Sequence, residues 1–215
     1  MSSITVRQLV DPSSKELDRV AAMLTEAYRN DMFANIMLGG DMSSLFNLRR
    51  ALITHSGKAG ELWVADHEGE LAGAVLFIKP GWERMDGSQG LKSEFAAILR
   101  KLSPETQNWW ANYMVPKIDE HLVRSLGDET WKAAWNVYSL GTHPDHRKRG
   151  VGKALIDVVI QKASEAGKLV TLGVMEEAPV TVELYKGWGF EVRGESIPLT
   201  ARLGTCYFSL MAKTP

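Results

Sequence analysis

The sequence contains a single cysteine, Cys206, among its 215 residues. One cysteine excludes an intramolecular disulfide and a metal site built from several thiolates. Because Cys206 stands within an apolar run, we expect a small buried side chain and not a nucleophile. A chain without a disulfide framework is typical of a reducing compartment. We therefore expect a cytoplasmic protein, and a single cysteine is equally compatible with the cytosol and the nucleus.

The chain also lacks a long apolar segment. Its longest apolar run, Leu71 to Ile78, is far shorter than the roughly 20 residues that a helix needs to cross a bilayer. Residues 1–7 do not show the charged-then-apolar order of a signal peptide. We therefore expect no membrane partner.

An excess of one charge is missing as well, since 25 Lys and Arg residues balance 26 Asp and Glu residues. Nucleic-acid binding needs a broad basic face, so we expect no nucleic-acid partner. His55 and His121 have no partner at the spacing of metal ligands, and His67 is predicted at an exposed turn. We expect no metal site.

No repeat or Pro- or Ser-rich linker divides the chain, which predicts one domain over residues 1–215. Apolar runs bounded by turn residues predict strands at 4–9, 61–66, 71–78, 131–142, 168–175, 190–193 and 205–211. Helical periodicity predicts helices from Ser13 or Ser14, from Ser43 or Ser44, and at 91–100, 104–124, 149–167 and 180–186, with a loop at 31–40. These elements predict an α/β fold with a mixed sheet of six to seven strands and a helical insert at about 80–130, after the third strand.

The stretch from Tyr138 to Leu155 has the most informative pattern. A β-prone run ends in a turn at 143–145, and a helix follows with Gly150 and Gly152 in its first turn. The first N–H groups of a helix lack intrahelical acceptors, and the helix dipole makes this end positive. Glycines let a phosphate approach the backbone closely. Four cations add charge at the same place: Arg147, Lys148, Arg149 and Lys153. The pattern predicts a diphosphate site.

Two segments together resemble a known family. Arg147-x-x-Gly150-x-Gly152 after a strand is similar to the pyrophosphate motif of the GNAT superfamily of acyl-CoA-dependent N-acyltransferases. The segment from Leu184 to Phe190, with Tyr185 second, is similar to the Leu-Tyr-x-x-x-Gly-Phe segment of that family. A dinucleotide fingerprint is excluded, because Leu155 stands where its third glycine is needed.

The resemblance implies a mostly antiparallel GNAT-like sheet flanked by helices, with acetyl-CoA as the cofactor. It implies that the pantetheine arm pairs with the strand end at Leu140, Gly141 and Thr142, where Gly141 would let the cofactor approach. The diphosphate would lie on the loop and helix start formed by Arg147, Lys148, Arg149, Gly150, Val151, Gly152 and Lys153.

The resemblance also implies catalytic roles. An amine attacks the thioester, the Leu140 N–H donates to the developing oxyanion, and the Tyr185 hydroxyl protonates the leaving thiolate. A phenol and a thiol have similar pKa values, so this transfer is feasible. As general base we select Glu176, at a strand end, with Tyr138 and His143 as weaker candidates.

Two further features bear on the acceptor. In the resembled family the first two helices enclose the acceptor, which makes Phe33, Ile36 and Met37 candidate pocket residues unless they pack on the core. The insert carries aromatic residues, Trp82, Trp109, Trp110 and Tyr113. It is predicted to be a lid, a homodimer surface or simply packing against the sheet.

The activity predicted from these features is transfer of an acetyl group to the primary amine of a small molecule. A protein acetyltransferase acting on lysine or an N-terminus is the first alternative. A non-catalytic acyl-CoA-binding module is the second, and it would need the acid to be missing.

Overall fold

The computed structural model describes residues 3–57, 60–81 and 94–214. Within these residues seven strands form one mixed sheet in the order β1-β2-β3-β4-β5-β7-β6, in which only the β4–β5 pair is parallel. The strands are β1 (Ile4–Leu9), β2 (Gly60–His67), β3 (Glu70–Ile78), β4 (Trp135–Thr142), β5 (Val170–Met175), β6 (Glu191–Ala201) and β7 (Gly204–Lys213). The prediction of a mixed, mostly antiparallel sheet is confirmed.

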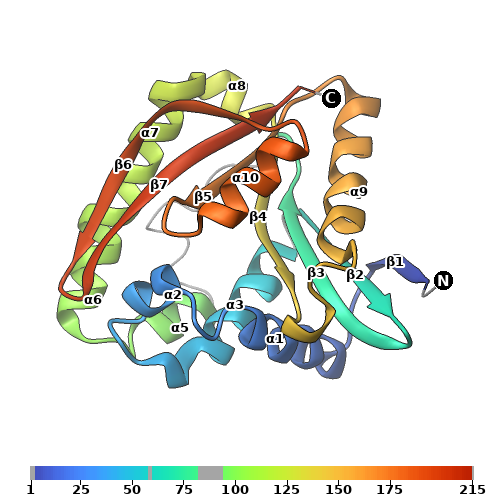
Figure 1. Cartoon of the computed structure of the whole chain (residues 1–215). Coiled ribbons are helices and arrows are strands. Elements are labelled where there is room, and N and C mark those ends of the chain that lie inside the picture. The colour runs from blue at the N-terminus through green and yellow to red at the C-terminus, as the bar shows by residue number, and fades with distance from the viewer. Residues whose placement is uncertain (1–2, 58–59, 82–93, 215) are drawn as a thin grey trace.

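Helices cover both faces of this sheet (Figure 1). One face carries α9 (Val151–Ala166) and α10 (Pro179–Gly187); the other carries α1 (Ser14–Ala27) and α3 (Leu45–Gly57), with α2 (Met32–Met37) between them in sequence. The insert contributes α5 (Glu94–Leu99), α6 (Pro104–Trp109), a π-helical turn at Trp110–Met114, α7 (Val115–Leu126) and α8 (Asp128–Lys132). Short 3-10 turns at Met42–Ser44 and Pro144–His146 precede α3 and α9.

β3 is a central strand, and its sequence shows why both faces are covered. Successive side chains of a strand point to opposite faces. Ala74 and Leu76 pack among the residues of α1 and α3, whereas Val75 and Phe77 pack among those of α9. An almost continuous apolar run is therefore what a strand buried on both sides requires.

The structure of β4 controls the middle of the sheet. β4 pairs with β5 only through Trp135–Val137, against Val170–Leu172, although β4 continues to Thr142. On its other side β4 has a bulge, because Val137 pairs with Phe77 and Ser139 with Leu76, which leaves Tyr138 as the extra residue. A bulge bends and twists a strand. Beyond Val137 the two strands diverge, and β4 has a free edge toward β5.

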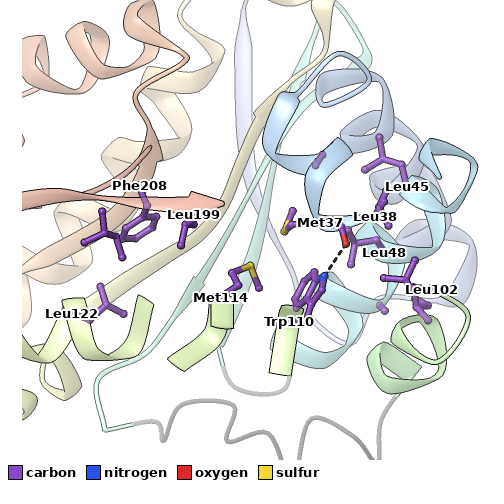
Figure 2. Packing of buried hydrophobic residues seen from close by; sticks show 14 of the residues in the cluster. Met37, Leu38, Leu45, Leu48, Leu102, Trp110, Met114, Leu122, Leu199 and Phe208 are labelled. Carbon is purple, nitrogen blue, oxygen red and sulfur yellow. Dashed lines mark hydrogen bonds between the residues drawn. The ribbon is translucent and has the colours of Figure 1, made fainter. Parts of the chain in front are cut away.

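The insert packs along the β6–β7 hairpin. Trp110 is buried in the same cluster as Met37, Met114 and Leu199, and its indole N–H donates to the Met37 carbonyl at 2.7 Å (Figure 2). The Trp109 indole N–H donates to the Thr200 carbonyl at 2.6 Å.

Tyr113 completes this contact, since its hydroxyl donates to the Pro198 carbonyl at 3.2 Å and accepts the Thr200 N–H at 3.3 Å. β6 is an edge strand, and these bonds use backbone groups that would otherwise remain exposed. Trp109, Trp110 and Tyr113 therefore pack the insert against the rest of the fold, which is the third of the alternatives given for these aromatic residues. Trp82 lies outside the described residues.

Several predicted boundaries were wrong, each for a local reason. The predicted loop at 31–40 contains α2, because Asp31 caps it by accepting the Ala34 N–H at 2.6 Å. Trp131 belongs to α8 and not to the central strand; acidic residues in the first turn of α8 and an Asp128–Lys132 ion pair at 2.5 Å stabilise this short helix. β6 continues well past Arg193, because a bulge between Arg193 and Ile197 accommodates the interruption in its pattern.

Gly141 provides a stability test. A Cβ at this position would lie 2.7 Å from Cδ2 of buried Leu24, 3.2 Å from the Tyr28 ring and 3.3 Å from the Ala27 Cβ. Gly141→Ala should therefore lower the free energy of unfolding by about 1–3 kcal/mol, because α1 must move from β4. Gly187→Ala is the matched control, since its new Cβ meets nothing within 4 Å. Urea unfolding measures both, and equal stabilities would contradict the packing described.

Candidate active site

The loop before α9, residues 147–150, has the backbone shape of an anion site, and we call it the phosphate loop. Lys148 and Gly150 both have positive φ, 60° and 88°, and Gly150 is the N-cap of α9 with no side-chain capping bond. Left-handed residues in such a turn can direct neighbouring N–H groups toward one concavity, which is a common way to bind an anion. The uncapped helix end adds its own free N–H groups and the positive end of the dipole. The residues present therefore fit a diphosphate.

The predicted cations lie around this loop in different roles. Arg147, Lys148 and Arg149 are exposed, as is Lys153. Arg147 donates to the Ala27 carbonyl at 2.9 Å, and Lys153 pairs with Asp157 one turn along α9. Arg147 thus holds the C-terminal end of α1 against the loop. Of the predicted cations, Lys148 and Arg149 have no ion pair with any residue that the structure describes.

Beyond Val137 the diverging strands β4 and β5 leave a gap in the sheet. The hydrogen-bond pattern of β4 shows which of its backbone groups face this gap. The His143 N–H donates to the Ala72 carbonyl at 2.8 Å. Because bonded and non-bonded pairs alternate along an antiparallel ladder, Gly141 and Ser139 bond to β3. Leu140 and Thr142 therefore direct their N–H and C=O groups away from β3, toward the gap beside β5. Three of the predicted cofactor positions lie here, but only Leu140 and Thr142 present backbone groups.

Gly141 also has a packing role. The space that its missing side chain leaves is filled by Leu24, Ala27 and Tyr28 of the α1 region. This glycine therefore admits α1 to β4.

Tyr185 lies beside the gap on α10. It is 8% exposed and makes edge-on ring contacts with Trp188 and Phe190, at centroid distances of 5.5 and 5.6 Å. Trp188 lies near the start of α9, because a Cβ on Gly152 would be 3.5 Å from its ring. Burial, and to a smaller degree Tyr28, raises the pKa of Tyr185. The phenol is therefore protonated at neutral pH, as an acid must be before it acts.

Glu176 follows β5 and is exposed. Its Oε1 accepts the Ser209 hydroxyl at 2.8 Å, and its N–H donates to the Tyr207 carbonyl at 2.9 Å. The carboxylate is thus oriented from β7 while remaining accessible to solvent.

The two weaker base candidates are less suited. The Tyr138 side chain is 47% exposed, but burial around it, with the charge of Asp119 as a smaller cause, raises the pKa of Tyr138 to about 12. A phenol with this pKa keeps its proton. His143 accepts the Asp145 N–H through Nδ1 at 3.3 Å, which caps the turn before the loop.

Sequence reasoning missed two residues near the gap, Tyr28 and Arg49. Tyr28 is the C-cap of α1, and its hydroxyl donates to the Leu140 carbonyl at 2.8 Å. This bond agrees with a Leu140 carbonyl that points away from β3. Arg49 of α3 lies over the Tyr28 ring, with Cζ 3.7 Å from the centroid. A charged residue within an otherwise apolar helical face was the available signal.

The acceptor candidates on the α2 segment are largely core residues. Ile36 is 2% exposed and Met37 9% exposed, while Phe33 is partly buried against the same cluster. Ile36 and Met37 therefore pack in the core, which was the alternative to a place in the acceptor pocket. A small surface cavity between β1 and α1, lined in part by Arg7, lies three strands from β4 and is unrelated to the gap.

The prediction that His67 lies at an exposed turn was wrong. His67 is 1% exposed, and its Nδ1 lies 3.0 Å from Nδ1 of His146, just before the phosphate loop. The turn itself is at Glu68 and Gly69, both with positive φ. Within 3–57, 60–81 and 94–214 no group of three or more acidic, His or Cys side chains is arranged to hold a metal.

Two other expectations concern the rest of the molecule. Cys206 is fully buried, and this burial, with Glu177 and Asp31, raises the pKa of its thiol to about 11. It is a core residue, as predicted. Across the described part of the chain, every helix is too short or too polar to traverse a bilayer.

Comparisons with known proteins agree with this geometry. The family model described as acetyltransferase (GNAT) family matches residues 24–190. A search of curated proteins finds no match.

Solved structures share the fold. A Corynebacterium glutamicum structure titled histone acetyltransferase HPA2 and related acetyltransferase is 24% identical, with TM-score 0.63 and coverage of 100% of this chain and 97% of that chain. The Drosophila melanogaster polyamine N acetyltransferase is 15% identical, with TM-score 0.63 and coverage of 99% and 100%. The yncA structure from Salmonella typhimurium, solved with acetyl-CoA, is 15% identical, with TM-score 0.59 and coverage of 98% and 93%.

At these identities the structural matches show the fold, and the family model carries the assignment. Its match spans most of the chain, including the β4 edge, the phosphate loop and Tyr185. The chain belongs to the GNAT acetyltransferase family and is an acetyl-CoA-dependent N-acetyltransferase.

Proposed function

We propose that this enzyme acetylates the primary amine of a small molecule by direct transfer in a ternary complex. One observation carries the choice of a compact acceptor: the β6–β7 turn meets the α2 segment. Arg202 donates to the Gly39 carbonyl at 3.3 Å. A Cβ on Gly204 would lie 3.4 Å from the Met32 side chain, and one on Gly40 would lie 3.4 Å from Leu203.

This contact joins the α2 segment to the β6–β7 hairpin, and Trp109 of α6 and Tyr113 of the π-helical turn also bond to that hairpin. An extended peptide would need an open groove in which its backbone could continue past the reacting amine. A rim closed by the contact between α2 and the hairpin would favour an acceptor that ends near the gap.

The proposed chemistry assigns each step to a residue of this chain. Bound acetyl-CoA supplies an activated acetyl group and a thiol leaving group. The Leu140 and Thr142 backbone groups and the α9 N-terminus hold and orient it, with Leu140 N–H as the donor to the acyl oxygen. Glu176 accepts the proton that the amine loses, directly or through water.

Tyr185 holds the proton that the departing thiolate takes. Its raised pKa opposes this transfer if the thiolate is in water. A thiolate released in the same buried environment is also poorly solvated, which raises its own proton affinity. The raised pKa of Tyr185 disfavours the proton transfer, and the raised proton affinity of the buried thiolate favours it. Because these two effects oppose each other, the buried phenol remains a competent acid.

The acceptor class can be tested by thiol release from acetyl-CoA. We expect turnover with at least one group among small amines, polyamines and amino sugars, and little with lysine-containing or N-terminal peptides. Activity on peptides alone would overturn the compact acceptor. Acetyl-CoA binding without turnover on any acceptor would favour the non-catalytic module.

The two proton carriers can be separated by variants. Tyr185→Phe should lower kcat by roughly 10²-fold or more, with acetyl-CoA affinity nearly unchanged, because it removes only the donated proton. Glu176→Gln should also lower kcat, and its deficit should shrink as pH rises, because a neutral amine then needs less help from a base. Steady-state rates from pH 6 to 9.5 measure both.

Glu183→Gln is the matched control, because Glu183 pairs with Lys186 at 2.7 Å on the surface of α10. This variant should retain activity. Tyr185→Phe with normal turnover at every pH would remove Tyr185 as the acid. A pH-independent deficit in Glu176→Gln would remove Glu176 as the base.

A further inference from the structure

Arg49 is a buried cation for which the described part of the chain supplies no paired anion. It lies on α3, is 5% exposed, and its Nε has no hydrogen-bond partner. Among the described residues, none forms a hydrogen bond or an ion pair with its guanidinium. An arginine keeps its charge in proteins. Burying an unpaired charge is costly. A buried charge that is retained without a partner therefore suggests a functional role for that side chain.

The groups around Arg49 reduce this cost only in part. Burial lowers the pKa of Arg49, and Tyr28 and Asp31 act in the opposite direction. Asp31 is an acid that contributes to this opposing effect, but its Oδ1 is engaged as the N-cap of α2 and it forms no ion pair with Arg49. The stacking on Tyr28, at 3.7 Å, is a cation–π contact that uses the face of the guanidinium. Its edge, which carries the N–H donors, is not used by that contact.

The position of Arg49 relates it to the active site. It lies on one side of the Tyr28 ring, and the Tyr28 hydroxyl bonds to the Leu140 carbonyl at 2.8 Å and lies 3.5 Å from the Ser139 hydroxyl. Leu140 is the backbone position that faces the gap. One aromatic ring therefore separates the cation from the edge where acyl transfer occurs. The diphosphate site lies beyond Thr142, at the other end of this edge, so the cofactor phosphates do not need Arg49.

We propose that Arg49 binds a carboxylate carried by the amine acceptor, so that the substrates of this enzyme are amino acids or related amino carboxylates. The proposal rests on the proposed function and deepens it. A guanidinium offers paired N–H donors that match the two oxygens of a carboxylate. Such a contact would neutralise the buried charge and would fix the distance between the carboxylate and the reacting amine. It selects against polyamines, whose additional positive charges would meet a cation.

The wild-type enzyme provides the first test. The substrates are ω-amino acids of increasing length, each paired with the ω-amino amide of the same length, so that only the charge changes appreciably. We expect kcat/KM to favour the acid by about tenfold to hundredfold at the best length, the usual effect of one hydrogen-bonded charge. Equal values for acid and amide, or a preference for polyamines, would overturn the proposal.

Variants of neighbouring arginines provide the second test. Arg49→Gln should raise KM for the acid about tenfold or more and leave the amide nearly unchanged, while Arg49→Lys should keep part of the preference. Arg50→Gln is the matched control on the same helix, because Arg50 already pairs with Asp18 at 2.7 Å. It should keep the full preference. Equal losses for acid and amide in Arg49→Gln would assign Arg49 a structural role and overturn the proposal.

The outcomes remain distinguishable from failure of the proposed function. If neither the amino acids nor the amino amides are acetylated although acetyl-CoA binds, the proposed acetylation of a small-molecule amine fails. The carboxylate proposal then fails with it. If amines are acetylated without regard to charge, only the role of Arg49 fails. The wild-type comparison decides this even if an Arg49 variant does not fold.

Discussion

β4 and β5 share hydrogen bonds over three residue pairs and then separate, and the remaining backbone of β4 has no strand on that side. Unpaired backbone groups in a protein interior are costly, so a gap in the middle of a sheet needs a reason. Here the bulge at Tyr138 bends β4, and alternation along the ladder directs Leu140 and Thr142 into the gap. A ligand with amide groups of its own can complete the edge as an added strand would.

The elements around the gap are held together by a few specific contacts. Arg147 joins the phosphate loop to the end of α1, Tyr28 joins the end of α1 to the Leu140 carbonyl, and Gly141 allows α1 to come this close. α9 approaches the other face of β3 in the same way, because a Cβ on Gly73 would lie 2.7 Å from the Val151 side chain. The residues proposed to bind the cofactor thus lie among residues that also pack the fold.

Sequence reasoning recovered the repeating features and missed those that depend on tertiary contact. The strands, the main helices and the phosphate loop follow from periodicity, caps and glycines, which are local. The short helices α2 and α8 were missed because caps and ion pairs stabilise them, not a long apolar face. The burial of His67 was missed because its partner, His146, is distant in sequence. The packing role of Gly141 was missed because nothing local indicates that α1 passes so near. The position of Arg49 was missed because it depends on α1 and α3 packing together.

The orientation of the β4 backbone can be measured directly by amide hydrogen exchange, residue by residue, with and without coenzyme A. The account predicts that the amides of Leu140 and Thr142 exchange rapidly in the free protein and become protected when coenzyme A is added, because both face the gap. The amides of Ser139 and Gly141 should be protected in both states, because they bond to β3. Protection of Leu140 and Thr142 in the free protein, or no change at either residue on saturation with coenzyme A, would contradict the account.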